Sequence, residues 1–145
     1  MTKAIRQITI ILENSPGALS KVSDILGKEG INVGAISLAE STDNSIIRLI
    51  TDNPEKTEQV FISNGYHTRT SEVIAIETPD HPGGLNAVLK PLSVAGINVH
   101  YLYPYLRRFR DNAILIFRVS DTEKTIAVLK ENYISVVDEK TIYSL

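Results

Sequence analysis

Two short stretches of the chain combine residue types that could bind a small polar molecule. The first is Asn14-Ser15-Pro16-Gly17, and the second, 66 residues later, is Asp80-His81-Pro82-Gly83-Gly84. Each precedes an apolar pattern with helical spacing, so we expect the first turn of a helix there, with Ser15 as a cap and Pro16 in the first turn. The free N–H groups and the positive dipole end of such a turn suit a carboxylate. Glycine lets a ligand approach the backbone closely.

An asparagine follows each stretch at the start of the next predicted strand, and we expect Asn32 and Asn98 to lie close to the preceding loops. Each side chain offers a donor and an acceptor. Loop and asparagine together could hold the carboxylate and the ammonium of a free amino acid. The other interpretation is that residues 15–17 only cap a helix and that Asn32 only completes a turn. The predicted ligand-binding residues are Asn14, Ser15, Pro16, Gly17, Ala18, Leu19, Asn32, Val33, Asp80, His81, Pro82, Gly83, Gly84, Leu85, Asn98 and Val99.

The two stretches differ in chemistry. The first offers neutral acceptors, whereas Asp80 and His81 of the second offer a carboxylate and an imidazole. Asp80 could meet an ammonium group, or it could be the N-cap of the helix that follows. We therefore expect an asymmetric pair of pockets.

The elements that must position these residues occur twice in the chain. Between residues 15–33 and 81–99, nine of the 19 positions are identical. For the first copy we predict strand 4–12, helix 15–30, strands 31–39 and 45–51, a helix opened by Asn53-Pro54 and closed by Asn64-Gly65, and an extended segment 66–70. For the second copy we predict strand 72–78, a helix from Pro82 to Gly96, strands 97–103 and 113–120, helix 122–132 and strand 133–138.

Each copy therefore reads β-α-β-β-α-β, an α+β ferredoxin-like unit with four antiparallel strands and two helices on one face. We place the first domain at residues 1–70 and the second at residues 71–145. Because 66–78 is almost continuously extended, the last strand of the first copy is expected to run into the first strand of the second. Pro91 predicts a kink near Ala87. Residues 139–145 (EKTIYSL) are predicted to form an extra strand that crosses back to the first unit.

With these motifs and this order of elements, the chain resembles the ACT domain family, as a tandem pair covering residues 4–138. The likeness is carried by NSPGAL (14–19) with GINV (30–33) and by DHPGGL (80–85) with GINV (96–99). The resemblance implies a non-catalytic sensor that binds a free amino acid at the interface between its two domains. It also implies a target enzyme of biosynthesis on another chain, and a homo-oligomer, namely a dimer.

Composition excludes several other classes. Without cysteine the chain has no thiolate metal site, disulfide or cysteine nucleophile. A net charge of −2 provides no global basic field for nucleic acid. We recognise neither a signal peptide nor a membrane span, so we expect a cytoplasmic protein. No Ser-His-Asp set or pair of catalytic carboxylates is evident. We therefore predict no catalytic residue, no cofactor, no bound metal, no nucleic acid and no membrane partner.

Three further features leave alternatives open. Arg107, Arg108 and Arg110 form either a solvated hairpin tip or an anion site. Tyr101, Tyr103 and Tyr105 alternate, so their rings share one face that belongs either to a core or to an oligomer interface. Pro104 marks that strand as an edge. Of the histidines, His81 and His100 are expected to approach one crevice, where two histidines make a weak metal site, and His67 is given a structural role.

Three classes of function are compatible with this fold. We favour the amino-acid sensor. The alternative is a structural or regulatory subunit that acts by protein–protein contact without a small-molecule ligand. An RNA reader on the same fold is disfavoured, because the expected central strands 46–51 and 113–117 have no aromatic residue apart from Phe117. A hydrolase of acyl phosphates is disfavoured because it would want an arginine in the first loop, and residues 13–19 have none.

Overall fold

The computed structural model describes residues 3–145, and the chain divides into two units. The N-terminal unit is Arg6–Ser71, and the C-terminal unit is Glu72–Leu145 together with residues 3–5. One boundary falls inside strand β4 (Thr68–Thr78). The last strand of the first copy therefore continues directly as the first strand of the second, as the extended segment predicts.

The N-terminal unit contains the predicted order of elements. These are β1 (Ala4–Glu13), α1 (Ala18–Lys28), β2 (Val33–Glu40), β3 (Asn44–Thr51), α2 (Pro54–Ser63) and the beginning of β4. The strands lie in the order β2-β3-β1-β4, and β3 is antiparallel to both β1 and β2. Asn53 caps α2 as predicted, because its side chain accepts from the Lys56 N–H at 3.1 Å.

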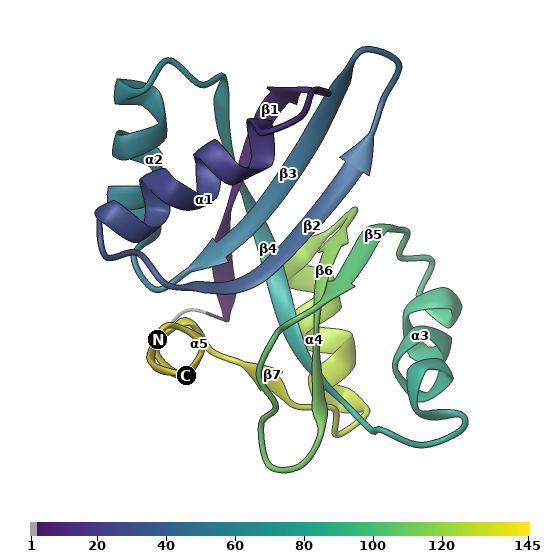
Figure 1. Cartoon of the computed structure of the whole chain (residues 1–145). Helices are drawn as coiled ribbons and strands as arrows, with labels where there is room; N and C mark the ends of the chain where they lie inside the picture. Colours follow the sequence, from purple (N-terminus) through teal and green to yellow (C-terminus); the bar gives the residue numbers. More distant parts are fainter. Residues whose placement is uncertain (1–2) are drawn as a thin grey trace. The chain divides into compact units, whose positions relative to one another are not determined.

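The core of this unit lies between its strands and its two helices (Figure 1). Val22 and Leu26 of α1 and Phe61 of α2 pack against the alternate residues of β1 and β3, such as Ile10 and Ile47, which face each other in register. Burying each of these side chains stabilises the unit by about 1.5–3 kcal/mol. Both helices thus cover one face of the sheet, which positions the start of α1 beside the end of β1.

The C-terminal unit repeats the arrangement and adds a helix. It contains the rest of β4, α3 (Gly84–Val94), β5 (Val99–Pro104), β6 (Ala113–Val119), α4 (Thr122–Glu131), β7 (Val136–Val137) and α5 (Glu139–Ser144). Its strands lie in the order β5-β6-β4-β7. The α+β class and the two ferredoxin-like units are therefore confirmed.

The proline within α3 does not interrupt the helix. α3 is one helix from Gly84 to Val94, with Pro91 inside it. Val88 and Leu92 are buried, as the corresponding residues of α1 are. α3 therefore buries residues that match those of α1, and the kink near Ala87 stays a prediction.

The prediction of an extra strand at the C-terminus is wrong, because residues 139–144 form helix α5. Asp138 caps it: the Thr141 N–H donates to its carboxylate at 2.9 Å. Hydrogen bonds from the Thr141 backbone and side chain lower the pKa of Asp138 below its ordinary value. The strand predicted at 133–138 is correspondingly reduced to Val136–Val137, since the cap ends it.

Two of the three alternating tyrosines belong to the core of the C-terminal unit, and Tyr101 is half-buried. Tyr103 and Tyr105 are buried, and the Tyr105 hydroxyl donates to the Ile142 carbonyl of α5 at 3.0 Å. In Figure 1, α5 and α3 lie on opposite sides of β6, so α5 covers part of the face that the helices α3 and α4 leave open. Pro104 ends β5, which is at the edge of the strand order as predicted.

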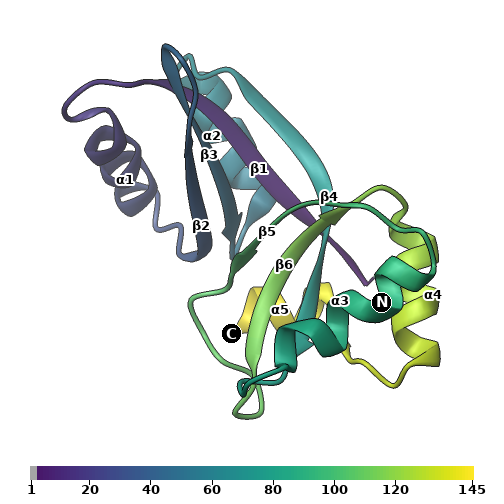
Figure 2. The same ribbon diagram turned by 90° about the vertical axis from the view of Figure 1, so that its right-hand side faces the viewer.

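Figure 2 shows the same helices from the side. Among residues 3–145, none of the helices has both the length and the apolar composition that a membrane crossing requires.

Candidate functional site

The Pro-Gly stretches form turns that precede the helices. The N-cap of α1 is Gly17, in the left-handed conformation (φ 85°), and no side chain caps the helix. The Ala18 N–H donates to the Ser15 carbonyl at 3.3 Å, which closes a turn before the helix begins. The expected roles of Ser15 as cap and Pro16 in the first helical turn are therefore wrong, because the left-handed glycine turns the chain between them and the helix. Gly83 (φ 87°) plays the same part before α3.

Asp80 does not cap α3 but pairs with an arginine of the β5–β6 turn. The Arg108 guanidinium contacts its carboxylate at 2.9 Å and also donates to the Asp111 carbonyl. The arginine cluster had two interpretations, a solvated hairpin tip and an anion site. The anion that Arg108 contacts is the Asp80 carboxylate of the chain itself. The two groups are 54% and 61% exposed, so the pair contributes little to stability.

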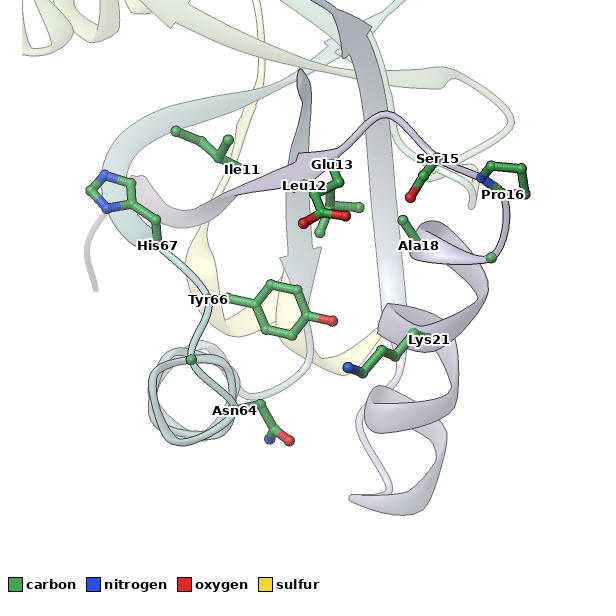
Figure 3. A pocket seen from close by; sticks show the side chains of 12 residues that line it. Ile11, Leu12, Glu13, Ser15, Pro16, Ala18, Lys21, Asn64, Tyr66 and His67 are labelled. Carbon is green, nitrogen blue, oxygen red and sulfur yellow. The ribbon is translucent and has the colours of Figure 1, made fainter. Parts of the chain in front are cut away.

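A cavity of about 630 Å³ lies beside the β1–α1 loop (Figure 3). Its volume is within the range of small-molecule sites. The end of β1, the start of α1 and the α2–β4 turn meet here, because β1 and β4 are neighbours and the Ile11 N–H donates to the His67 carbonyl at 3.3 Å. We call this cavity the N-terminal pocket; it is lined by Ile11, Leu12, Glu13, Ser15, Pro16, Gly17, Ala18, Lys21, Asn64, Gly65, Tyr66 and His67.

The pocket has charges of both signs. Figure 3 shows the Glu13 carboxylate, the Lys21 ammonium and the Tyr66 hydroxyl around the same space. Across residues 3–145, no side chain forms an ion pair with either Glu13 or Lys21. The Tyr66 ring is held by an edge contact with Phe61 at 5.7 Å. A zwitterion could therefore place its ammonium at Glu13 and its carboxylate at Lys21.

Part of the predicted set of site residues lies at this pocket. Residues 15–18 line it directly. Asn14 and Leu19 line a smaller adjacent cavity of about 140 Å³, together with Leu38 and Ser45. The predicted loop thus borders two hollows of the same unit.

Sequence reasoning missed the residues that give the pocket its polar lining. Lys21 follows Gly17 by four residues, one helical turn, so its spacing could have indicated that it faces the loop. The α2–β4 turn carried no such signal, and His67, which we gave a structural role, lies in the lining. The missed polar residues are Glu13, Lys21, Asn64, Tyr66 and His67.

The two asparagines lie away from the loops within their own units. α1 has 11 residues, so Asn32-Val33 is at the other end of a helix about 16 Å long. The Asn32 N–H donates to the Asp52 carboxylate at 3.0 Å and its carbonyl accepts from the Asp52 N–H at 3.1 Å. At Asn98-Val99, Ser120 makes the corresponding pair of contacts at 3.1 and 2.9 Å. The expected closeness is wrong within each unit, and the ligand role of these residues stays a prediction.

The histidines of the second copy do not share a crevice. His81 is in the β4–α3 loop, with Nδ1 2.9 Å from the Pro82 carbonyl oxygen. His100 is in β5, beyond the other end of α3, where it contacts the Asn98 amide at 3.3 Å. Within the described part of the chain, no group of three or more His, Asp or Glu side chains could hold a metal ion.

The second copy lacks the charged and aromatic lining residues of the N-terminal pocket. The Glu77 N–H donates to the Ser135 carbonyl at 3.0 Å, as the Ile11 N–H does to that of His67, so the two turns correspond residue by residue. By this correspondence and the 66-residue repeat, Glu13, Lys21, Tyr66 and His67 match Pro79, Ala87, Ile134 and Ser135. The charged and aromatic groups are thus particular to the first copy.

Comparison with known proteins gives consistent matches over the whole chain. A family model described as an ACT domain pair matches residues 1–145. Protein BT0572 from Bacteroides thetaiotaomicron is 33% identical, with 99% of this chain and 98% of that chain covered and a TM-score of 0.91. The regulatory subunits of aspartate kinase from Thermus thermophilus and Thermus flavus share the fold at 14% identity each. Their TM-scores are 0.63 and 0.58, with 88% and 91% of this chain and 92% and 97% of theirs covered. No curated protein matches the chain.

Proposed function

The chain belongs to the ACT domain pair family, and from this premise we propose that it is a non-catalytic regulatory protein that binds a free amino acid in its N-terminal pocket. The observation that carries the proposal is that a carboxylate and an ammonium, Glu13 and Lys21, line one cavity of suitable size and that neither has an ion-pair partner among residues 3–145. The resemblance of its two Pro-Gly motifs to those of the ACT domain family implies the same ligand class.

The geometry suggests how a ligand would be held. Lys21 and the first turn of α1 offer positive charge and a positive dipole end to the α-carboxylate. Glu13 offers its carboxylate to the ammonium. The ligand side chain would then meet Tyr66 and Ile11, one polar at its hydroxyl and one apolar. Because no catalytic machinery is evident, binding itself would be the signal, passed to an enzyme on another chain.

Thermal-shift screening of the full chain against the twenty amino acids tests the proposal. A ligand at 100 times its dissociation constant adds about 2.7 kcal/mol, which raises the melting temperature by roughly 5–10 °C. Replacing one charged contact, as in Lys21→Ala or Glu13→Gln, should weaken binding roughly 10- to 150-fold. Lys28→Ala, in the same helix but outside the pocket, and Glu40→Gln, at the end of β2, are the matched controls.

Two results would contradict the proposal in different ways. Unchanged affinity in both pocket variants would place the ligand elsewhere. No shift with any amino acid would instead favour the alternative function, a regulatory subunit that acts by protein contact alone; capture of an enzyme from cell extract would then be the test.

We further infer that the chain forms a homodimer through the edge of its N-terminal unit. β2 ends the strand order there and carries Ile36 and Leu38, which are 38% and 54% exposed, next to Leu19 of α1 at 40%. An exposed apolar edge strand is a template for pairing with another chain. Light scattering should report a dimer for the wild type and a monomer for Leu38→Lys. Leu106→Lys, which also changes an exposed leucine, should leave the dimer intact; a dimer in all three proteins would exclude this edge.

A further inference from the structure

One residue breaks the rule by which the helices of this chain end. Helices α1 to α4 each end at a residue in the left-handed conformation, with the same pair of hydrogen bonds. The N–H of this left-handed residue donates to the carbonyl three residues before it, and the N–H of the next residue donates to the carbonyl five residues before itself. In α1, α2 and α3 the left-handed residue is Gly30, Gly65 and Gly96. In α4 it is Tyr133, with φ 58°.

A tyrosine is costly at this position, since its Cβ disfavours the left-handed conformation that glycine adopts freely. The packing of the chain does not compensate, because Tyr133 is 96% exposed. The matching residue of the first copy, Gly65, makes the same backbone turn without a side chain. An exposed aromatic ring held at a conformational cost points to a contact with something outside the chain.

Tyr133 stands at the rim of a cavity of about 490 Å³ in the C-terminal unit, which we call the C-terminal pocket. Isoleucines 126 and 134 provide an apolar wall, and the pocket has two lysines but no acidic residue in its lining. The lining residues are Lys3, Ile126, Lys130, Tyr133, Ile134, Ser135 and Val136. None of them belongs to the N-terminal pocket.

The two lysine ammonium groups of this pocket have few partners among residues 3–145. The carbonyls of Leu129 and Lys130 are satisfied by the N–H groups of Ile134 and Tyr133, so they do not need the Lys130 ammonium. No carboxylate among residues 3–145 forms an ion pair with Lys130. Lys3 is directed to the rim, where its ammonium donates to the Val136 carbonyl at 3.2 Å.

We propose that the C-terminal pocket is a second ligand site, separate from the amino-acid site, and that it binds a small aromatic anion. The ring of the ligand stacks on Tyr133 and lies against the two isoleucines. Its acidic group pairs with Lys130, and Lys3 adds a second cation. The proposal does not depend on the function assigned to the N-terminal pocket, since the two cavities have no residue in common.

Titration of the full chain with the aromatic sulfonate 8-anilinonaphthalene-1-sulfonate, followed by its fluorescence, tests this site. We expect saturable binding that weakens at least tenfold in Tyr133→Gly and in Lys130→Ala, and that persists in Tyr133→Phe. Lys124→Ala, in the first turn of the same helix, and Lys21→Ala, in the N-terminal pocket, should leave the affinity unchanged.

The glycine variant also separates binding from folding. Because glycine fits the left-handed position, Tyr133→Gly should melt higher than the wild type by roughly 2–4 °C while losing the probe. The proposal is overturned if the wild type does not bind the probe, or if Tyr133→Gly and Lys130→Ala bind it as the wild type does. An equal loss in Lys21→Ala would also overturn it, because the probe would then occupy the other cavity.

Discussion

Replacement of Gly84 by alanine should destabilise the protein through a clash of backbone with the new methyl group. A Cβ built on Gly84 would lie 1.9 Å from the carbonyl oxygen of Pro79 and 2.8 Å from its carbonyl carbon. No side-chain rotation can relieve this contact, so either the β4–α3 loop or the start of α3 must move. Overpacking of this kind costs about 1–3 kcal/mol, and each kcal/mol lowers the melting temperature of a chain of this size by roughly 2–4 °C.

Thermal melting followed by circular dichroism measures the effect, and the neighbouring glycine provides a control. Gly83 has φ 87° but open space around its Cβ position, so Gly83→Ala introduces backbone strain without a clash. The repeat provides a second control, since Ala18 occupies the matching position of the first copy and Ala18→Gly should cost about 0.5–1 kcal/mol at most. If Gly84→Ala melts within a degree of the wild type, the close approach of Pro79 to α3 does not exist.

Two further predictions concern acid stability and stoichiometry. The pKa of Asp138 is lowered in the folded chain, so the stability that this carboxylate contributes is present above its unfolded pKa and is lost as the pH falls through its folded pKa. The difference in melting temperature between wild type and Asp138→Ala should therefore be constant near neutral pH and shrink in acid. A difference that grows in acid would mean that folding raises the pKa of Asp138 and does not lower it. The N-terminal pocket has an acidic and a basic lining residue, whereas the charged lining residues of the C-terminal pocket are lysines. Calorimetric titration with the amino acid found by screening should therefore give one site per chain, and two equal sites would contradict the asymmetry.

Much of the fold could be predicted because its signals are local and occur twice. The Gly30-Ile31-Asn32-Val33 and Gly96-Ile97-Asn98-Val99 stretches each end a helix and start a strand, as their glycines indicate. The tail could not be predicted in the same way. The helix at 139–144 is only six residues long, and it is held by Asp138 and by the Tyr105–Ile142 contact, which joins residues far apart in sequence. Tertiary contacts of this kind override a weak local preference.

The candidate site could be predicted only in part, because the pocket is closed by a segment distant in sequence. The loop at 14–17 was found from its own motif. Tyr66 and His67 reach it through the pairing of β1 with β4, which a motif does not specify. The prediction that Asn32 lies beside the loop at 14–17 failed for the opposite reason. The loop and Asn32 belong to one sequence motif, but the whole length of α1 separates them in space.

The repeat itself helps to separate scaffold from function. At several positions where the backbone takes the same path, both copies keep the same residue, as at Gly30 and Gly96 or at Asn32 and Asn98. Two of the positions at which the copies differ line the two cavities: Lys21 of the first copy has no charged counterpart in the second, and Tyr133 of the second stands where the first has a glycine. A duplicated fold needs neither change in order to be stable, and Tyr133 works against stability. Under the two proposals made above, these two departures give each copy a ligand chemistry of its own.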